Sequence, residues 1–244
     1  MPFLQRDDAT IYYEEHGTGF PVLALAPGGM RSAGSFWEKM PWNPVKELAA
    51  SYWVITMDQR NAGLSTARVT GAEGWPTYTA DQLALLDHLG VDRCHVVGMC
   101  IGGPFILGLL RAAPQRIAHA VALQPIGLAD NREAFREMFA DWVAEQTPKH
   151  PEATQQTWEM YWSAMYGGQD VLFSVPESFL PTVTTPLLVL RGNDQFHPSD
   201  ASRLLASSVP GAQLVEQWKD GEHLVVATAT IAEFLAAFHD EVLR

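Results

Sequence analysis

Cysteine is scarce in this sequence: the 244 residues include only two, Cys94 and Cys100. Both lie in one apolar segment, and an extended chain would place their Cα atoms roughly 20 Å apart, several times the separation that a disulfide allows. We therefore predict two free thiols. Because no paired Cys/His cluster accompanies them, we also expect no structural zinc site and no other metal site.

Basic residues and long apolar runs are also few. Sixteen Lys and Arg against 28 Asp and Glu give a formal net charge of −12, which repels phosphate backbones and anionic lipid, and no Lys/Arg cluster forms a local exception. We expect no nucleic-acid partner. No segment reaches the length of an apolar membrane span, and the first residues lack a basic segment followed by an apolar one. The sequence therefore predicts a cytoplasmic protein that makes no membrane contact.

What is present is the composition of a globular protein, with 47% hydrophobic and 18% charged residues. Short apolar runs bounded by glycine, proline or polar residues predict buried strands. These lie at residues 22–27, 53–58, 94–99, 119–124, 186–192 and 212–218. Segments with helical spacing lie between or after them, at 80–90, 103–114 and 230–244. This alternation predicts an α/β fold with a mostly parallel sheet flanked by helices, and the alternating residues 3–17 predict an antiparallel hairpin at its edge.

One region interrupts the alternation of strand and helix. Residues 127–183 read as long helices and concentrate large side chains, namely Trp142, Trp158, Met160, Tyr161, Trp162, Met165 and Tyr166. We interpret 127–183 as a helical cap inserted into a core formed by 1–126 and 184–244, all as one folding unit. Most of these side chains should pack the cap itself, and we expect Trp142, Trp162, Met165 and Tyr166 to line an apolar substrate pocket.

The segment Gly98-Met99-Cys100-Ile101-Gly102 has the spacing of a sharp turn from strand to helix. Glycines two residues to each side of Cys100 are needed because a side chain at either place would collide with the neighbouring backbone. Such a turn exposes its middle residue at the amino end of a helix, where the dipole and free N–H groups lower a thiol pKa. We therefore predict that Cys100 is a nucleophile and that Cys94 is a buried small residue.

A cysteine nucleophile needs a base and an acid that orients it. Asp194 follows the strand at 186–192, at the sheet edge where sites of α/β proteins gather. His223 follows the last strand, in a segment that we expect to be a loop. We predict His223 as the base and Asp194 as its partner, with Asp200 the weaker alternative acid. His197 is less favoured as the base because it is so close to Asp194 in sequence.

An oxyanion hole completes such a site, with two N–H groups directed at the oxygen that becomes negative. Ile101 directly follows the nucleophile, so its backbone N–H supplies the first donor. The loop after the first buried strand, Ala26-Pro27-Gly28-Gly29-Met30, offers the second. We predict Gly29 for this role, with Met30 as the alternative.

These ordered motifs resemble the α/β-hydrolase fold superfamily over nearly the whole chain. Pro27-Gly28-Gly29 is similar to its His-Gly-x oxyanion loop, with proline in place of histidine. The segment 58–65, DQRNAGLS, resembles its Asp-x-Arg-Gly-x-Gly-x-Ser loop, with asparagine replacing one glycine; we expect Asp58 and Arg60 to be structural there. The resemblance implies an α/β-hydrolase fold with a cap and a nucleophile, acid and histidine in the order Cys100, Asp194 and His223.

Cysteine at the nucleophile position resembles dienelactone hydrolase, whose Gly-x-Cys-x-Gly-Gly motif matches residues 98–103. This likeness is local, because the cap and the 58–65 loop look instead like capped esterases, peptidases and lactonases. Haloalkane dehalogenases and epoxide hydrolases of this fold carry an aspartate where this chain has Cys100, which argues against those activities.

The sequence thus predicts a cofactor-independent hydrolase of carboxylic esters, lactones or thioesters that acts through an acyl-cysteine. Its partner would be a small acyl substrate with an apolar or aromatic part. Two alternatives stay open. The same acyl-cysteine could transfer its acyl group to an alcohol, an amine or a growing polyester, as polyhydroxyalkanoate synthases do, although this chain is short for one. The fold could also serve a non-catalytic ligand-binding or sensor protein. The sequence does not indicate the oligomeric state.

Overall fold

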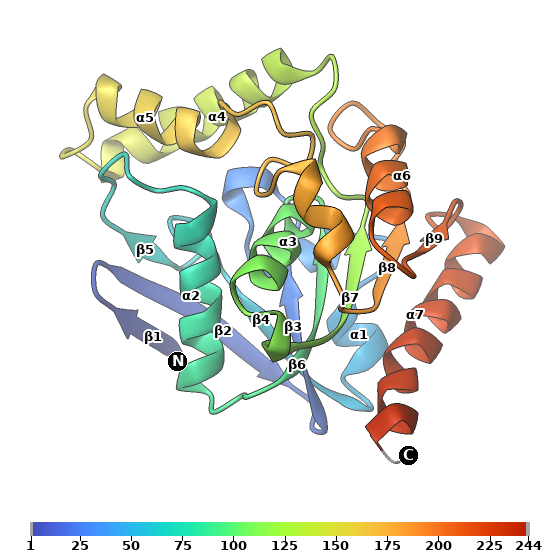
Figure 1. Cartoon of the computed structure of the whole chain (residues 1–244). Coiled ribbons are helices and arrows are strands. Elements are labelled where there is room, and N and C mark those ends of the chain that lie inside the picture. Colours follow the sequence, from blue (N-terminus) through green and yellow to red (C-terminus); the bar gives the residue numbers. More distant parts are fainter. Residues whose placement is uncertain (1, 243–244) are drawn as a thin grey trace.

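The computed structural model describes residues 2–242, with the side chains of residues 2–238. A nine-stranded sheet forms its centre, with its main path in the order β1-β2-β4-β3-β6-β7-β8-β9 and β5 paired to β2 (Figure 1). The strands are β1 (Phe3–Arg6), β2 (Ala9–His16), β3 (Phe20–Leu25), β4 (Tyr52–Met57), β5 (Thr66–Ala67), β6 (Cys94–Met99), β7 (Ile117–Leu123), β8 (Leu187–Leu190) and β9 (Gln213–Val215).

The sheet is parallel from β4 to β9, and the β1–β2 hairpin joins it antiparallel through β2. Both features agree with the sequence prediction. Strand β6 lies between β3 and β7, with Val97 opposite Ala24 on one side and Val121 on the other. Every residue of β6 is buried, because helices cover both faces of the sheet. The turn that follows β6 therefore begins at the centre of the sheet's carboxyl edge.

Two layers of helices cover the sheet. The helices are α1 (Pro44–Leu48), α2 (Trp75–His88), α3 (Gly102–Ala112), α4 (Arg132–Gln146), α5 (Gln155–Tyr166), α6 (Ser199–Ser208) and α7 (Gly221–Val242). Short 3-10 turns are η1 (Gly29–Arg31), η2 (Gly34–Lys39), η3 (Pro114–Arg116), η4 (Thr147–Lys149) and η5 (Glu177–Thr182). Helices α2, α3 and α6 bury apolar side chains in the core on one face, and α1 and α7 do so on the other. This is the α/β-hydrolase architecture that the motifs implied.

Helix α7 begins earlier than the sequence predicted. The expected loop around His223 is helical from Gly221 onward, because the N–H of Leu224 bonds to the carbonyl of Asp220 and starts the helix. The prediction read the apolar spacing only from residue 230, whereas Ala227 and Ile231 both pack on the sheet. His223 consequently lies in the first turn of a helix and not in a loop.

The stretch Gly221–Phe238 of α7 is also long and apolar enough to cross a membrane by length and composition alone. This is weak evidence for a span, since core helices of soluble proteins pass the same test. Four of its buried side chains, Ala227, Ile231, Phe234 and Leu235, pack into the sheet core. The cytoplasmic location stays a prediction.

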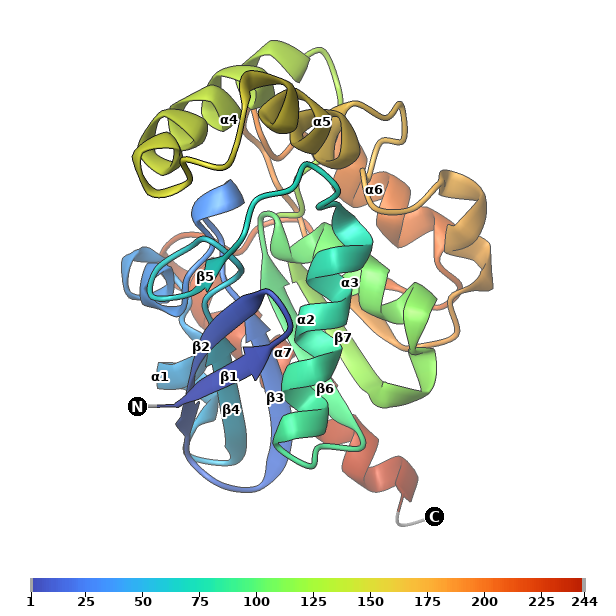
Figure 2. The same ribbon diagram turned by 90° about the vertical axis from the view of Figure 1, so that its left-hand side faces the viewer.

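Helices α4 and α5 are inserted between β7 and β8 and lie above the carboxyl ends of the central strands (Figures 1 and 2). They form the helical cap. Arg31 of η1 bonds α4 through a two-pronged contact with Glu145, with both N···O distances 2.8 Å. A Cβ at Gly29 would lie 2.7 Å from Met138 Sδ of α4, so the cap also packs directly on the turn after β3. The exact limits of the cap at 127 and 183 stay a prediction.

The segment 58–65 is held by buried polar contacts, as expected for a structural loop. Asp58 accepts backbone N–H groups from Gly34 at 2.8 Å and Leu64 at 2.7 Å. Arg60 makes a two-pronged ion pair with Asp81 of α2, with Nε–Oδ2 2.7 Å and Nη2–Oδ1 3.0 Å. Asp81 is fully buried and Arg60 nearly so, which makes this pair a fixed link between the loop and α2. Asp81 carries no motif of its own and was not predicted.

Replacing Asp81 by alanine should therefore destabilise the fold. The change breaks the ion pairs of Asp81 with Arg60 and Arg6 and leaves the buried Arg60 guanidinium only a 3.6 Å contact with the exposed Asp8, and breaking such a buried pair costs about 3–5 kcal/mol in the free energy of unfolding. Chemical denaturation followed by circular dichroism measures this. The matched control is Asp200→Ala: its carboxylate is 96% exposed and pairs with Arg203 only at 3.9 Å, so stability should change by less than about 0.5 kcal/mol. Equal losses in the two variants would contradict a structural role for Asp81.

Candidate active site

Cys100 occupies the sharp turn between β6 and α3 in a left-handed backbone conformation, with φ 61°. A Cβ on Gly98 would lie 2.6 Å from the carbonyl oxygen of Gly102, and one on Gly102 would lie 2.7 Å from that of Leu25. Both glycines are thus required by close backbone approach, as their spacing indicated. The strained cysteine is held by its N–H bond to Leu123 O at 3.0 Å and by N–H bonds from Gly103 and Ile126 to its carbonyl, both 3.1 Å.

Cys100 is partly exposed as a residue although its sulfur lies in a buried environment, whereas Cys94 is buried throughout, and neither forms a disulfide. The backbone N–H groups of Gly28 and Ile101 lie close enough to the Cys100 sulfur to lower the pKa of the thiol. Ile101 was expected in this place. Gly28 was not: the prediction chose Gly29, with Met30 as the alternative.

The geometry of the turn after β3 explains the shift by one residue. Gly28 has φ 121°, a conformation that favours glycine, and this directs its N–H toward the thiol. Gly29 and Met30 lie in the 3-10 turn η1, where Gly29 faces Met138 of the cap. Which glycine of a Gly-Gly pair points its N–H inward depends on backbone angles that the sequence does not show.

Asp194 and His197 form one compact turn after β8. The Asp194 Oδ1 atom accepts from the backbone N–H groups of Phe196 and His197, both at 3.1 Å, and contacts His197 Nδ1 at 2.6 Å. A Cβ on Gly192 would lie 2.5 Å from His197, so the absence of a side chain at 192 lets the turn fold back on itself. The short sequence separation that argued against His197 is what allows one turn to present both side chains.

His197 faces Cys100 with its other ring nitrogen. Nε2 is buried and makes no aligned hydrogen bond among the described residues, yet the ring is close enough to the thiol for each to shift the other's pKa. Loose alignment of this kind is common in catalytic pairs before substrate binds. Because Nδ1 is engaged by Asp194, Nε2 is the nitrogen left to exchange a proton with the sulfur.

The electrostatics of the three side chains favour charge separation. Burial alone would raise the pKa of Cys100, but the positive His197 ring and the two backbone N–H groups outweigh it and lower the pKa below its usual value. Burial would likewise lower the pKa of His197, but the thiolate and the Asp194 carboxylate raise it overall. Burial opposes ionisation of Asp194, yet His197 and Lys219 hold its pKa below the usual range. The site therefore stabilises a thiolate–imidazolium pair with an ionised aspartate behind it.

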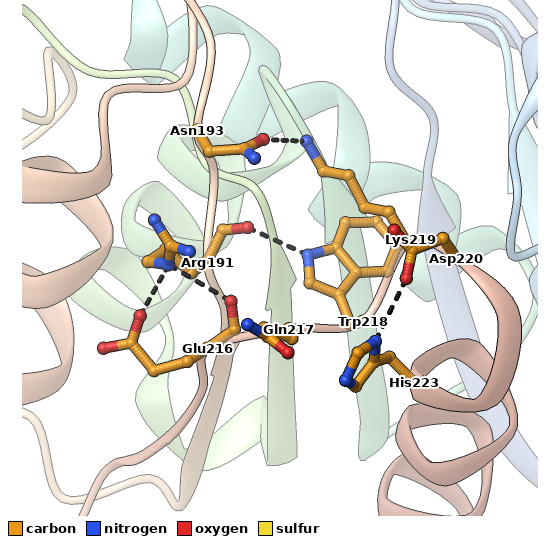
Figure 3. A pocket seen from close by; sticks show the side chains of 8 residues that line it. All are labelled: Arg191, Asn193, Glu216, Gln217, Trp218, Lys219, Asp220 and His223. Carbon is orange, nitrogen blue, oxygen red and sulfur yellow. Dashed lines mark hydrogen bonds and ion pairs between the residues drawn. The ribbon is translucent and has the colours of Figure 1, made fainter.

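The predicted base, His223, lies elsewhere in the structure. Its ring turns toward Asp220, with Nδ1–Oδ1 3.1 Å, and its side chain is 53% exposed at a surface pocket of about 240 Å³ (Figure 3). No contact between His223 and Cys100 or Asp194 occurs among the described residues. The structure thus brings together Cys100 and Asp194 as predicted, with His197 between them in the place assigned to His223.

The segment before α7 reaches the site through Lys219 instead. Its side chain extends across Trp218, and its ammonium group bonds Asn193 Oδ1 at 2.9 Å (Figure 3). The same ammonium group lies 3.7 Å from Asp194 Oδ2. Trp218 is held in turn by its ring N–H, which donates to the carbonyl of Arg191 at 2.9 Å. Lys219 therefore adds a positive charge on the outer side of Asp194.

The four predicted pocket residues occupy different environments in the cap. Trp142 and Met165 are buried, Trp142 between the rings of Phe139, Trp158 and Tyr161. Trp162 is partly exposed and lies under the guanidinium of Arg136. Tyr166 is fully buried, and the charge on Cys100 is among the causes that raise the pKa of its hydroxyl. Its O–H contacts Met30 in the turn after β3, two residues beyond Gly28.

Among the described residues, no group of three or more His, Cys, Asp or Glu side chains is placed to hold a metal ion.

Comparison with known proteins shows the family. Residues 21–159, more than half of the chain, match the alpha/beta hydrolase fold family. The chain belongs to that family. A protein of Azorhizobium caulinodans named as a carbamate hydrolase, RutD, is 28% identical to it, and the alignment covers 99% of each chain.

Solved structures agree in fold. Est816, described as an N-acyl homoserine lactone degrading enzyme, superposes with a TM-score of 0.71 at 23% identity over 96% of this chain and 100% of that one. The enol-lactonase from Burkholderia xenovorans LB400 gives a TM-score of 0.70 at 20% identity, over 96% and 100% of the two chains. At these identities the likeness establishes the α/β-hydrolase fold alone.

Thiol alkylation as a function of pH distinguishes the two histidines. A lowered Cys100 pKa means that the thiolate persists below the pH at which an ordinary cysteine, with a pKa of about 8.5, becomes protonated. Iodoacetamide should therefore label wild-type Cys100 rapidly at neutral pH. His197→Ala removes the positive ring that offsets the effect of burial on the Cys100 thiol, so the pKa of Cys100 should rise. The rate of labelling at pH 7 should then fall at least about tenfold, which is the effect of a one-unit shift in pKa.

The control for this experiment is His223→Ala, which should leave the rate of labelling and its pH dependence at the wild-type values. The adduct is located by peptide mass spectrometry, with Cys94→Ala confirming that the buried second thiol does not contribute. A loss in His223→Ala and none in His197→Ala would restore His223 as the partner of the thiol.

Proposed function

We propose that the protein hydrolyses carboxylic esters, lactones or carbamates through an acyl-cysteine intermediate, without a cofactor. The observation that carries this proposal is the contact series Cys100, His197 and Asp194 at the carboxyl edge of the sheet, with two N–H groups at the sulfur. Cys100 acts as the nucleophile, His197 as general acid and base, and Asp194 as the group that orients the ring. This arrangement replaces His223 by His197 in the triad expected from the sequence.

In the first half-reaction the thiolate attacks the carbonyl carbon. A carbon–sulfur bond forms, and the electron pair of the carbonyl π bond moves to the oxygen, which the N–H groups of Gly28 and Ile101 stabilise. The tetrahedral intermediate then collapses and breaks the bond to the leaving oxygen. That oxygen takes the proton from Nε2 of the His197 imidazolium, which leaves a neutral ring and an acyl-cysteine. In a lactone the leaving alcohol stays attached to the acyl chain.

In the second half-reaction neutral His197 removes a proton from water. The hydroxyl attacks the thioester carbon, the carbon–sulfur bond breaks, and the acid is released while the thiolate–imidazolium pair is restored. Throughout, the Asp194 carboxylate holds Nδ1 and stabilises the ring cation, which keeps the proton exchange on Nε2.

The choice of substrate class rests on the chemistry and on the comparisons. A thiolate attacks activated acyl groups more readily than amides, which favours lactones and activated esters, with thioesters as further candidates. The similarity to a protein named as a carbamate hydrolase adds carbamates. The local likeness to dienelactone hydrolase around Cys100 supports the cysteine nucleophile, and the aromatic side chains around Tyr166 favour an apolar or aromatic substrate part.

Intact-protein mass spectrometry tests the proposal. After brief incubation with 4-nitrophenyl butanoate, wild type should gain the mass of one butanoyl group, and Cys100→Ala should gain none. His197→Ala should acylate more slowly and release the acyl group more slowly, since it lacks the base that activates water. His223→Ala is the matched control and should behave as wild type.

Adding an alcohol or amine acceptor at the same time separates hydrolysis from acyl transfer. Hydrolysis predicts free butanoic acid as the main product, whereas predominant butanoyl transfer would favour the acyltransferase alternative. If wild type forms no adduct with esters, lactones or carbamates but binds a ligand saturably, the proposal fails and a binding protein becomes the better interpretation.

A further inference from the structure

The hydroxyl of Tyr166 is a buried hydrogen-bond donor that the proposed mechanism does not use. It lies between the two loops that meet at Cys100, because the O–H contacts Met30, two residues after Gly28, and the ring stacks on Phe135, which contacts Phe196 beside His197. Tyr166 is fully buried, and its O–H makes a single hydrogen bond among the described residues, to Met30 Sδ at 3.5 Å. A thioether sulfur is a weak acceptor. Leaving a buried hydroxyl with so poor a partner costs free energy, so the arrangement needs an explanation.

The ring of Tyr166 is held rigidly in this position. Phe135 stacks on it at 5.4 Å with an interplanar angle of 23°, and Trp162 lies at 5.3 Å. The edges of Trp75, Phe139 and Phe173 contact it at 6.0, 6.3 and 5.4 Å. Arg132 also binds the Tyr166 carbonyl. The hydroxyl is therefore preorganised, which is typical of a group that recognises a ligand.

The protonation state suits a donor. Burial raises the pKa of Tyr166 well above its usual value, and the charges of neighbouring groups, Cys100 among them, add to this. The phenol consequently keeps its proton over the whole range in which the thiolate is present. It can donate a hydrogen bond but supplies no negative charge.

The position of Tyr166 indicates which part of a substrate it meets. Its partner Met30 belongs to η1, which follows β3, whereas His197 belongs to the turn after β8. Strand β6, with Cys100 at its end, lies between them in the sheet. In the proposed mechanism the leaving group lies toward His197 and the carbonyl oxygen toward Gly28 and Ile101. The Tyr166 hydroxyl is therefore placed to meet the acyl part of the substrate.

We propose that Tyr166 is a specificity-determining residue that donates a hydrogen bond to a second acceptor of the substrate, an ether, keto or hydroxyl oxygen on the acyl chain close to the scissile carbonyl. This inference rests on the proposed acyl-cysteine mechanism. It narrows the substrate class to acyl compounds that carry one polar oxygen on an otherwise apolar chain, because the surroundings of the hydroxyl are aromatic and a plain hydrocarbon chain would leave it with Met30 alone.

Three 4-nitrophenyl esters with the same leaving group test the inference: butanoate, methoxyacetate, in which an oxygen replaces one methylene, and 3-oxobutanoate. The measured quantity is the kcat/KM of each oxygen-bearing ester relative to that of butanoate. In Tyr166→Phe at least one of these ratios should fall about tenfold or more from its wild-type value. Comparing ratios between enzymes cancels the intrinsic reactivity of the esters.

Tyr161→Phe is the matched control. It removes another buried hydroxyl of α5, one that bonds Tyr78 at 2.6 Å, and should leave both ratios at the wild-type values. Thermal unfolding of both variants confirms that they fold, and Phe keeps the ring contacts at 166. If wild type turns over the esters but neither ratio moves in Tyr166→Phe, the inference is wrong and the proposed function stands. If wild type forms no acyl adduct with any of them, both fail.

Discussion

The arrangement of the candidate site depends on one sterically restricted backbone turn, the turn at Cys100. Cys100 stands in a left-handed conformation between β6 and α3. The turn can form because Gly98 and Gly102 lack side chains: a Cβ on either residue would collide with the carbonyl oxygen of a neighbouring segment. The turn places the sulfur at the centre of the sheet's carboxyl edge, over the loops that follow β3 and β8. The N–H of Gly28 from the first loop and the ring of His197 from the second then converge on it. The chemistry that we propose depends on this convergence.

Charge and burial act together at the site. A buried thiol alone would hold its proton, and Cys94 illustrates this: burial raises its pKa to about 12. Cys100 differs because a cationic ring and two backbone N–H groups compensate for the burial. Asp194 and, behind it, Lys219 extend the alternation of charge outward to the surface. The cap completes this environment, since the contacts of Arg31 with Glu145 and of Gly29 with Met138 hold α4 against the turn after β3. The same cap supplies Tyr166, so the proposed recognition of the substrate would involve an element that is anchored beside the thiol.

The sequence predicted the fold well because its signals are local. Apolar strand segments, the edge hairpin and the glycines around Cys100 each express a requirement met within a few residues. The buried pair of Arg60 and Asp81 shows the opposite case, since 21 residues separate the partners and nothing in the spacing marks Asp81. The start of α7 was misjudged because residues 225–230 are rich in β-branched side chains, which favour helices weakly, and because the apolar Val225 and Val226 lie exposed away from the buried face, although Ala227 already packs on the sheet.

By itself the sequence determined the sharp turn at Cys100, the place of Asp194 after β8 and the helices inserted between β7 and β8, because each depends on residue types at fixed spacing. Only the tertiary structure decided which histidine faces the thiol and which glycine of the turn after β3 directs its N–H toward it. Those outcomes depend on how separate loops meet in space. His197 reaches Cys100 because Gly192 lets its turn fold back, whereas His223 is drawn into the first turn of α7 and bonds Asp220. Backbone angles and helix limits of this kind are set by packing between distant segments, and no local pattern records them.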